Sequence, residues 1–319
     1  MAYGQSGHLG VTFQESFGTT FTGSAFYVPL ISESIAEKIE QLTEANLYGR
    51  LAESPTHEGT HEVAGEIRTE AHPLYLGVWL KAALGGVAST LQDSVYAHEF
   101  LPAAADWDGY AALPPLALEV HRDAGSAFLY SDVLGDALTL EVAHGQLLAA
   151  SLKVLGGRAT RQAAAAPAFL AGRPWTWDVV SASYDGAGIA DFRKLSLTFD
   201  NRLATQHALS GSRTPQRIKR DGPQQVRVAG TFLLANDLLF SEYVDQSEKR
   251  LLVVLTGEGI GSGYNATLTL DVPRLRLSEV APQLSGPGQL EVSFAGAGVY
   301  DPTSGYALRA TLTNTQPAY

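Results

Sequence analysis

The chain contains no cysteine at any of its 319 positions. This absence excludes a disulfide framework and any zinc site built from thiolates. Long apolar runs are also missing, since no segment reaches the roughly 18 consecutive apolar residues of a membrane span. The first residues, 1-MAYGQSGHLGVTFQES-16, lack the basic start and apolar core of a secretory signal. These absences predict a protein that is made in the cytosol and has no membrane partner.

Basic residues are the second deficit. Lys and Arg number 22 against 33 Asp and Glu, which gives a formal net charge of -11. A protein that wraps DNA around its surface needs clustered Lys and Arg, so this balance argues against that role. An acidic surface is also a common aid to solubility. The local basic run 213-RTPQRIKR-220 has no interleaved aromatic residue and is predicted to be an exposed loop.

Alternation of apolar and polar residues is abundant. Hydrophobic residues make up 45% and charged residues 17% of the chain, and 319 residues allow about two domains of ordinary size. Apolar side chains recur at every second position, for example at Leu116, Leu118 and Val120. The same pattern marks residues 137–145, 194–201, 267–272 and 289–298. We therefore predict a mainly β chain of half-buried antiparallel sheets.

Two segments have a helical pattern instead. Residues 72–84 carry an apolar stripe and end before two glycines, which is typical of a helix stop. Residues 236–249 start with Asn236 or Asp237 as a potential cap. The apolar stripe of this second segment consists of Leu239, Tyr243 and Val244. We predict one helix in each segment.

A short motif occurs twice in the same context. Val63-Ala64-Gly65 recurs as Val228-Ala229-Gly230, and an acidic-Gly pair precedes each copy while a strand pattern and a helix pattern follow. Further on, 152-LKVLGGRA-159 resembles 290-LEVSFAGAG-298. We predict a tandem duplication of two antiparallel β domains, each with one helix. The expected parts are a first domain with an N-terminal arm at 1–160, a junction at 161–174 and a second domain at 175–319.

The duplication decides an ambiguous segment. Residues 34–44 have apolar side chains at helical spacing. Their counterpart in the second copy, at roughly residues 197–206, alternates like a strand. Because tertiary context overrides local propensity, we predict a strand for residues 34–44.

The stretch 55-PTHEGTHEVAGEI-67 contains His-Glu-x-x-His. On a helix, His57 and His61 would share one face and hold zinc, and Glu58 would be the general base of a metalloprotease. Gly59 interrupts the motif, a proline precedes it and a strand pattern begins directly after it. A third ligand is not identifiable either. We therefore predict a loop that enters a strand, with no metal, no catalytic residue and no cofactor.

Three other candidate sites have simple structural interpretations. The glycines of 257-GEGIGSG-263 lack the following helix and Lys of a phosphate loop, so they predict a flexible hairpin. Asp106 and Asp108 suggest calcium or glycosidase chemistry, but further ligands are missing and a solvated turn is expected. His98 lies among aromatic and apolar residues and is expected to be packed and hydrogen-bonded rather than a general base.

Trp175 and Trp177 alternate near the junction on a probable strand. Two aromatic rings could bind a sugar, which would make the chain a carbohydrate-binding or adhesin β-sandwich. Buried packing or a contact between subunits is the more common role of such residues. No G-x-S-x-G motif for a nucleophilic serine is present.

Several stretches carry a family resemblance through their order and spacing. They are 29-PLISESIAEKIEQLTEANLYGR-50, 57-HEGTHEVAGEIRTEAHPLYLGVWLKAALGG-86, 95-VYAHEFLP-102, 114-PPLALEVHRD-123, 137-ALTLEVAHGQLLAASLKVLGG-157 and 195-LSLTFDNRLATQHALSGS-212. Together they resemble the tail tube proteins, or major tail proteins, of long-tailed bacteriophages (siphophages). The duplication matches members that carry two tube domains in one chain.

The resemblance implies that each domain is an antiparallel β-sandwich or barrel with a flanking helix. It also implies that the sheets join side by side into a ring and that the rings stack into a hollow tube. With two domains per chain, the ring would be a homotrimer with pseudo-hexameric symmetry. The chain would be a non-enzymatic virion protein, assembled in the host cytoplasm. Its partners would be other copies of itself, a tape measure protein in the lumen before ejection, and DNA that passes through without specific binding.

The charge of the chain fits such a conduit, because an acidic lumen repels phosphates whereas a basic wall would bind them. Ring closure would also remove exposed sheet edges. The N-terminal arm, residues 4–29, is expected to be either an edge strand or a contact to a neighbouring ring. A needle-type secretion tube subunit remains an alternative to the phage tail tube.

Overall fold

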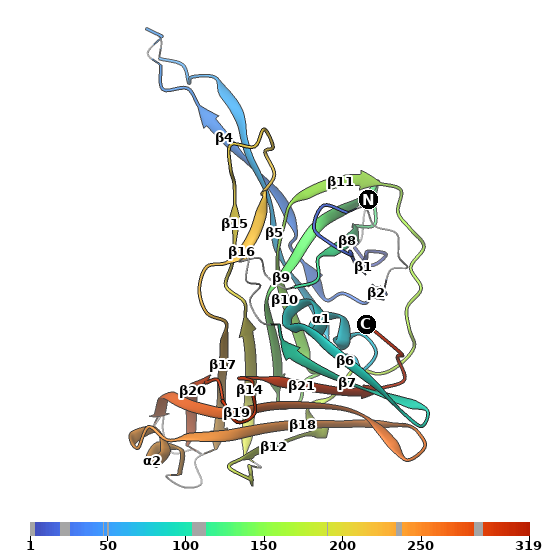
Figure 1. Ribbon diagram of the computed structural model, residues 1–319, viewed down its shortest axis with the longest axis vertical. Helices are drawn as coiled ribbons and strands as arrows, with labels where there is room; N and C mark the ends of the chain where they lie inside the picture. Colours follow the sequence, from blue (N-terminus) through green and yellow to red (C-terminus); the bar gives the residue numbers. More distant parts are fainter. Residues whose placement is uncertain are drawn as a thin grey trace.

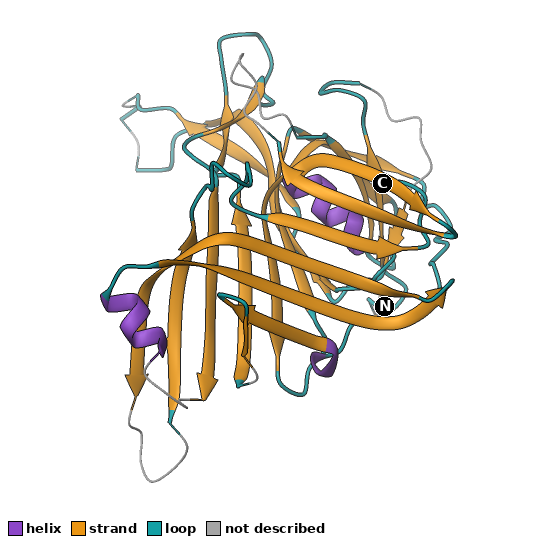
Figure 2. Ribbon diagram, turned by 60° about the horizontal axis from the view of Figure 1, so that its bottom comes forward, coloured by secondary structure: helices purple, strands orange, loops and turns teal. Residues whose placement is uncertain are grey.

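The computed structural model describes residues 4–19, 26–46, 48–49, 51–103, 113–189, 191–233, 238–283 and 290–319. Long antiparallel strands dominate these residues, and two short α-helices accompany them (Figures 1 and 2). The predicted mainly β class is therefore confirmed. In the part of the chain that is described, no helix is long and apolar enough to cross a membrane.

The elements follow one another along the chain. Residues 8–162 form β1 (His8–Phe13), β2 (Phe26–Val28), β3 (Ser32–Glu33), β4 (Ala36–Thr43), β5 (Thr56–Glu70), α1 (Leu76–Leu84), β6 (Gly85–Gln92), β7 (Val95–Pro102), β8 (Leu116–His121), β9 (Ala127–Ala143), β10 (Ala149–Gly156) and β11 (Arg158–Gln162). Residues 177–314 form the 3₁₀ turn η1 (Trp177–Val179), β12 (Val180–Tyr184), β13 (Ala187–Ile189), β14 (Phe192–Asp200), β15 (Leu203–Gln206), β16 (Arg217–Arg220), β17 (Gln225–Leu233), α2 (Leu238–Val244), β18 (Glu248–Gly261), β19 (Tyr264–Gln283), β20 (Glu291–Gly298) and β21 (Arg309–Asn314).

One long antiparallel sheet runs through the molecule. Its strands lie in the order β4, β5, β10, β9, β14, β17, β20 and β19. Side chains alternate between its two faces, so residues such as Leu140, Phe199 and Val228 are buried in the core. We call this arrangement the long sheet, and we call its other, more accessible side the open face.

The fold has two layers, of which the long sheet is the first. The two longest strands, β9 and β19, extend from the long sheet into the second layer. In β9, residues near Phe128 pair with β8 while residues 137–143 pair with β14. In β19, residues 267–271 pair with β21 while residues 275–283 pair with β20. The second layer continues from β21 to β7 and β6, and the apolar core lies between the layers (Figure 2).

Helix α1 confirms the first predicted helix and its stop. It begins at Leu76 rather than at residue 72, and it ends where Gly85 adopts a φ of 85° and donates its N–H to the carbonyl of Lys81. This left-handed conformation favours glycine. Nearly all of α1 is buried against β9 and its neighbours, so its stability comes from packing.

Helix α2 is shorter than predicted. It covers Leu238–Val244, because the polar residues from Glu248 onward already belong to the long strand β18. Leu239 is buried as expected, but Val244 is 60% exposed and does not belong to the apolar stripe. The proposed caps Asn236 and Asp237 lie outside the described residues.

The strands β4 and β16 lie in segments whose sequence patterns were ambiguous or misleading. Residues 36–43 form β4, which confirms the strand predicted for 34–44. The loop predicted for 213–220 is wrong at its end, because Arg217–Arg220 form β16 and pair with β15. The buried side chain of Ile218 sits between charged neighbours on this strand, and a single apolar residue was too weak a pattern to identify it.

The beginning of the chain is part of the core. Strand β1 pairs with β2 on one side and with β8 on the other. Leu9 and Val11 are completely buried. Residues 8–13 therefore form a strand, but the predicted edge strand is wrong, because β1 is paired on both sides. Residues 1–3 and 20–25 lie outside the described part of the chain.

Candidate assembly surfaces

The His-Glu-x-x-His segment is a strand. It lies on β5, which starts at Thr56, earlier than the predicted strand. Four residues of a strand span about 13 Å, so His57 and His61 do not converge as they would on a helix. His57 Nε2 lies 2.7 Å from Glu44 Oε1, and His61 is held between Glu37 and Glu58. The geometry of a zinc peptidase is therefore absent from this segment.

His98 is a packed core residue, as the sequence predicted. Its side chain is 0% exposed on β7. Its Nδ1 lies 2.7 Å from Ser89 Oγ, and its Nε2 lies 2.9 Å from the carbonyl oxygen of Gln316. Burial lowers the pKa of His98, which favours the neutral form of the imidazole. Asp106 and Asp108, the other acid–base candidates, lie outside the described residues.

The structure agrees with only part of the predictions for the two tryptophans and confirms the hairpin at the glycine run. Trp175 is buried, as expected, whereas Trp177 is 41% exposed and lies in η1. The strand predicted for the two tryptophans is wrong, because only a single bridge, Leu147 to Thr176, forms there among the described residues. The hairpin predicted for residues 257–263 is confirmed, since it joins β18 to β19.

The open face of the long sheet is lined by small side chains. They include Ala64, Ala137, Thr139, Ala149, Ser151, Ser196, Thr198, Ala229, Thr231, Ser293, Ala295 and Ala297. Across the β9–β14 pairing, the hydroxyl oxygens of Thr139 and Thr198 are 2.9 Å apart. Next to them, Lys194 forms an ion pair with Glu141.

Charges on the open face are mixed. The acidic side chains among its described residues are Glu62, Glu66, Glu70, Glu141, Asp200, Glu279 and Glu291. The basic side chains are Lys38, Arg68, Lys153, Lys194, Arg227 and Arg276. Because the two signs are nearly balanced here, the negative surplus of the chain is not concentrated on this face.

Both ends of the long sheet have an unpaired edge. At one end, β4 pairs with β5 on one side and with no other described strand. At the other end, β19 pairs with β20 up to Gln283, and β18 covers its opposite side only as far as Arg276. The short helix α2, which precedes β18, also contacts β19 but pairs with none of its backbone groups as a strand would. Unpaired backbone N–H and C=O groups at such edges are ready to pair with another chain.

Two hairpins project beyond the body on the same side, and they are formed by β4 with β5 and by β15 with β16 (Figure 1). They brace each other, because the His61 N–H donates to the carbonyl of Arg213 at 2.8 Å. The Arg213 guanidinium also pairs with Glu58. At the tips, Leu51 and Leu209 are 108% and 110% exposed.

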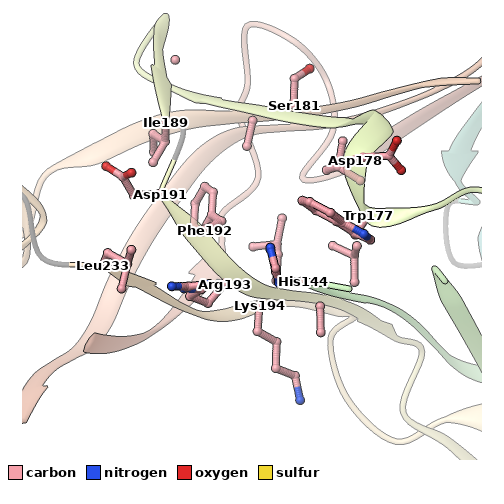
Figure 3. Close-up of a pocket in the computed structure, with 16 residues that line it drawn as sticks. His144, Trp177, Asp178, Ser181, Ile189, Asp191, Phe192, Arg193, Lys194 and Leu233 are labelled. Atoms are coloured by element: carbon pink, nitrogen blue, oxygen red, sulfur yellow. The ribbon is translucent and has the colours of Figure 1, made fainter. Parts of the chain in front are cut away.

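A cavity of about 740 Å³ lies at the opposite end of β14, which we call the end cavity (Figure 3). Its walls come from the end of β9, from η1 and β12–β13, from the start of β14 and from the end of β17. The rings of Trp177 and His144 pack with centroids 4.2 Å apart. Asp178 and Asp191 are exposed on different sides of its mouth. These residues come from separate segments, so sequence reasoning did not find the cavity.

The open edges, the projecting hairpins and the end cavity contain no arrangement of catalytic side chains among the described residues. The chain matches the model of a family described as phage tail tube protein over residues 4–298. This match covers nearly the whole chain, so the chain belongs to the phage tail tube protein family. No curated protein matched the chain. As a family member it is a structural subunit of a phage tail tube and a component of the virion, which favours the tail tube over the secretion needle and the adhesin.

Proposed function

We propose that three copies of this chain close into a ring, and that such rings stack into a hollow tube through which DNA passes during infection. The observation that carries this proposal is the pair of open edges on the long sheet. β4 offers one edge and the end of β19 offers the other. Pairing of β19 in one copy with β4 in the next would remove both edges when the ring closes.

The joint between β9 and β14 supports this closure. Within one chain these strands pair in register from Ala137 with Asp200 to Ala143 with Lys194. β9 ends the strand group β4–β5–β10–β9, and β14 begins the group β14–β17–β20–β19. A joint of the same kind between chains would repeat this contact around the ring.

We further propose that the two strand groups are the cores of tandem tube domains, at 1–160 and 175–319 with the junction at 161–174. Val63-Ala64-Gly65 lies on β5 and Val228-Ala229-Gly230 on β17, and a helix follows each strand. The sequence similarity aligned residue 152 with residue 290. The strands that pair with β5 and β17, which are β10 and β20, support an alignment shifted by two residues. Gly65 faces Val154 and Gly230 faces Phe294, so residues 152–156 correspond to 292–296.

The open face is the proposed lumen wall. Its small Ala, Ser and Thr side chains leave few projections that would grip a passing chain. The net charge of the chain predicts an acidic lumen, but acidic and basic groups are nearly balanced on the described part of this face. DNA binding to such a wall is not favoured by counterion release, as it would be on a basic wall. The wall also repels phosphates less strongly than the acidic lumen that the net charge predicts. Before ejection the same lumen would hold the tape measure protein.

The remaining parts of the proposal concern cellular role. The subunit would assemble in the host cytoplasm and act without catalysis, cofactor or metal. DNA would pass without sequence-specific contacts.

Purified protein provides the test. Electron microscopy combined with a mass measurement of single rings should show closed rings of three chains. As a variant, Glu37→Pro places a proline on β4, where it opposes pairing with another chain. We expect this variant to remain folded but to form no closed rings. Glu37→Ala loses the same side-chain contact with His61 but keeps its backbone N–H, so it should form rings normally. Rings of unchanged yield from the Glu37→Pro variant would contradict closure through β4.

A further inference from the structure

We propose that the end cavity receives the tip of the β15–β16 hairpin of a second copy of this chain, in the next ring of the tube. This inference rests on the proposed function, because it names the residues that would join one ring to the next.

The hairpin and the cavity lie at opposite ends of the same strands. β14 starts at the cavity with Phe192 and ends at Asp200, directly before the hairpin. β17 returns from the hairpin and ends at the cavity with Leu233. Nine strand residues separate the two ends by about 27 Å. A shift of one copy along this strand direction therefore brings its hairpin toward the cavity of the next copy, in a head-to-tail contact that can repeat without limit.

The hairpin tip carries an unpartnered apolar side chain. Leu209 is the most exposed of the large hydrophobic residues in the described part of the chain. The tip is held in place rather than loose, because β15 pairs with β16 and the carbonyl of Arg213 accepts the N–H of His61. A rigid apolar tip on a projecting hairpin loses little freedom when it binds.

The end cavity offers an apolar lining for that tip. Trp177 lines the cavity, is partly exposed and packs against His144 (Figure 3). The other apolar walls are Val142, Val180, Ile189, Phe192 and Leu233. At about 740 Å³ the cavity has ample room for a leucine and the small residues around it, Ala208, Ser210 and Gly211.

The charges of the two parts are complementary. The segment 202–220 contains five basic residues and no acidic one. Arg213 at its tip pairs with Glu58 of the neighbouring hairpin, and the other four lie in or next to β15 and β16. At the mouth of the cavity, Asp178 and Asp191 are exposed. Of the basic residues that line the cavity, Lys194 is already paired with Glu141, and Arg193 is partly buried. A basic hairpin that enters the cavity would therefore meet the two carboxylates.

Cross-linking tests this contact, because the chain has no cysteine of its own. Leu209→Cys and Ser181→Cys place one thiol on the tip and one at the cavity in a single chain. After assembly, a short bifunctional maleimide should link these chains into a ladder of dimers, trimers and longer products. Each single variant, and the pair Leu209→Cys with Leu91→Cys on β6, should give no ladder. A ladder from Leu51→Cys with Ser181→Cys instead would assign the cavity to the other hairpin and overturn the proposal.

A second variant separates ring stacking from ring formation. Leu209→Asp places a charge at the tip, so we expect rings to form normally while the fraction of protein in tubes falls about tenfold or more. Long tubes from Leu209→Asp, with no ladder from the cysteine pair, would overturn the inference and leave the ring intact. Failure of the unaltered protein to form rings would overturn the proposed function and this inference with it.

Discussion

The ring of Tyr319 occupies the space that a side chain on residue 77 would need. A Cβ at Gly77 would lie 2.2 Å from Cε2 of Tyr319. The phenol group is fixed as well, since Tyr319 Oη accepts from Asn314 Nδ2 at 2.6 Å and donates to the carbonyl of Leu74 at 3.1 Å. Lys81 Nζ donates to the main-chain oxygen of Tyr319. Residue 319 thus locks against α1, more than two hundred residues earlier in the chain.

We expect Gly77→Ala to reduce the free energy of unfolding by about 2 kcal/mol, because displacing a buried ring outweighs the better helix propensity of alanine. Tyr319→Ala should have a similar or larger effect. The double variant should be no less stable than Tyr319→Ala, since removal of the Tyr319 ring also removes the clash with the added Cβ. Denaturant unfolding measures all three. Gly188→Ala is the control, because no atom lies within 4 Å of its added Cβ. Unchanged stability of Gly77→Ala would contradict the packing described.

The buried carboxylate of Asp271, on β19, binds side chains from β18 and from the segment before β21. Asp271 is 1% exposed, and both of its oxygens accept hydrogen bonds from Arg250 at 2.8 Å. Tyr306 donates a further hydrogen bond at 2.8 Å. Burial alone would raise the pKa of Asp271, but Arg250, Tyr306 and Arg309 outweigh it and lower the pKa.

We expect Asp271→Ala to cost about 3 kcal/mol of stability, because it leaves the donors around it without an acceptor. Glu258→Ala is the matched control. It removes an exposed ion pair with Arg173 and should cost less than about 1 kcal/mol. Since the pKa of Asp271 is lowered, its contribution should be lost only as pH falls below the ordinary value of 3.8. Equal effects of the two variants at neutral pH would contradict this account.

His98 should make the protein less stable in mild acid. Burial lowers its pKa below the ordinary value of 6.5, so the unfolded chain takes up a proton that the folded chain does not. Stability should therefore fall as pH drops from about 7.5 to about 5.5, and the fall should be smaller in His98→Gln. Burial lowers the pKa of His72 in the same direction, so part of the slope should remain. Parallel pH profiles for the two proteins would exclude His98 as the source.

His61 should act in the opposite sense, on the projecting hairpins. Hydrogen bonding to Glu37 raises the pKa of His61, and hydrogen bonding to Glu58 raises it further. Burial lowers the pKa, but the two glutamates outweigh this effect. The stabilising effect of His61 is therefore fully present below pH 6.5 and is lost as pH rises through the raised pKa. Hydrogen exchange of residues 203–220 should be faster in His61→Gln than in the unaltered protein at low pH, with little difference at high pH. His57→Gln, which loses only its contact with Glu44, should leave that exchange unchanged.

Much of the fold follows from local pattern. Period-two alternation identified β8, β9, β14 and β20, because half-buried strands impose it directly. The stop of α1 was predicted from Gly85, whose backbone conformation few other residues adopt. For β4 the local pattern suggested a helix, and comparison with the segment that we propose as its counterpart predicted the strand instead. Repetition carried information there that propensity did not.

The features that the sequence did not reveal share a physical cause, which is contact between distant segments. The polarity of Asp271 gave no sign that it is buried, because its partners Arg250 and Tyr306 lie on other elements. The end cavity draws Val142, Trp177 and Leu233 from three separate segments, and no spacing rule joins them. The joint between β9 and β14 is also non-local, so the open edges became visible only in the folded chain.

The most direct test of the account is a cryo-electron microscopy reconstruction of rings or tubes assembled from the purified chain. We predict three chains per ring, each of 33.9 kDa, with β19 of one chain beside β4 of the next and the open face toward a central channel. A ring of six chains, a reconstruction with the open face on the outside, or protein that stays monomeric under all conditions would contradict it.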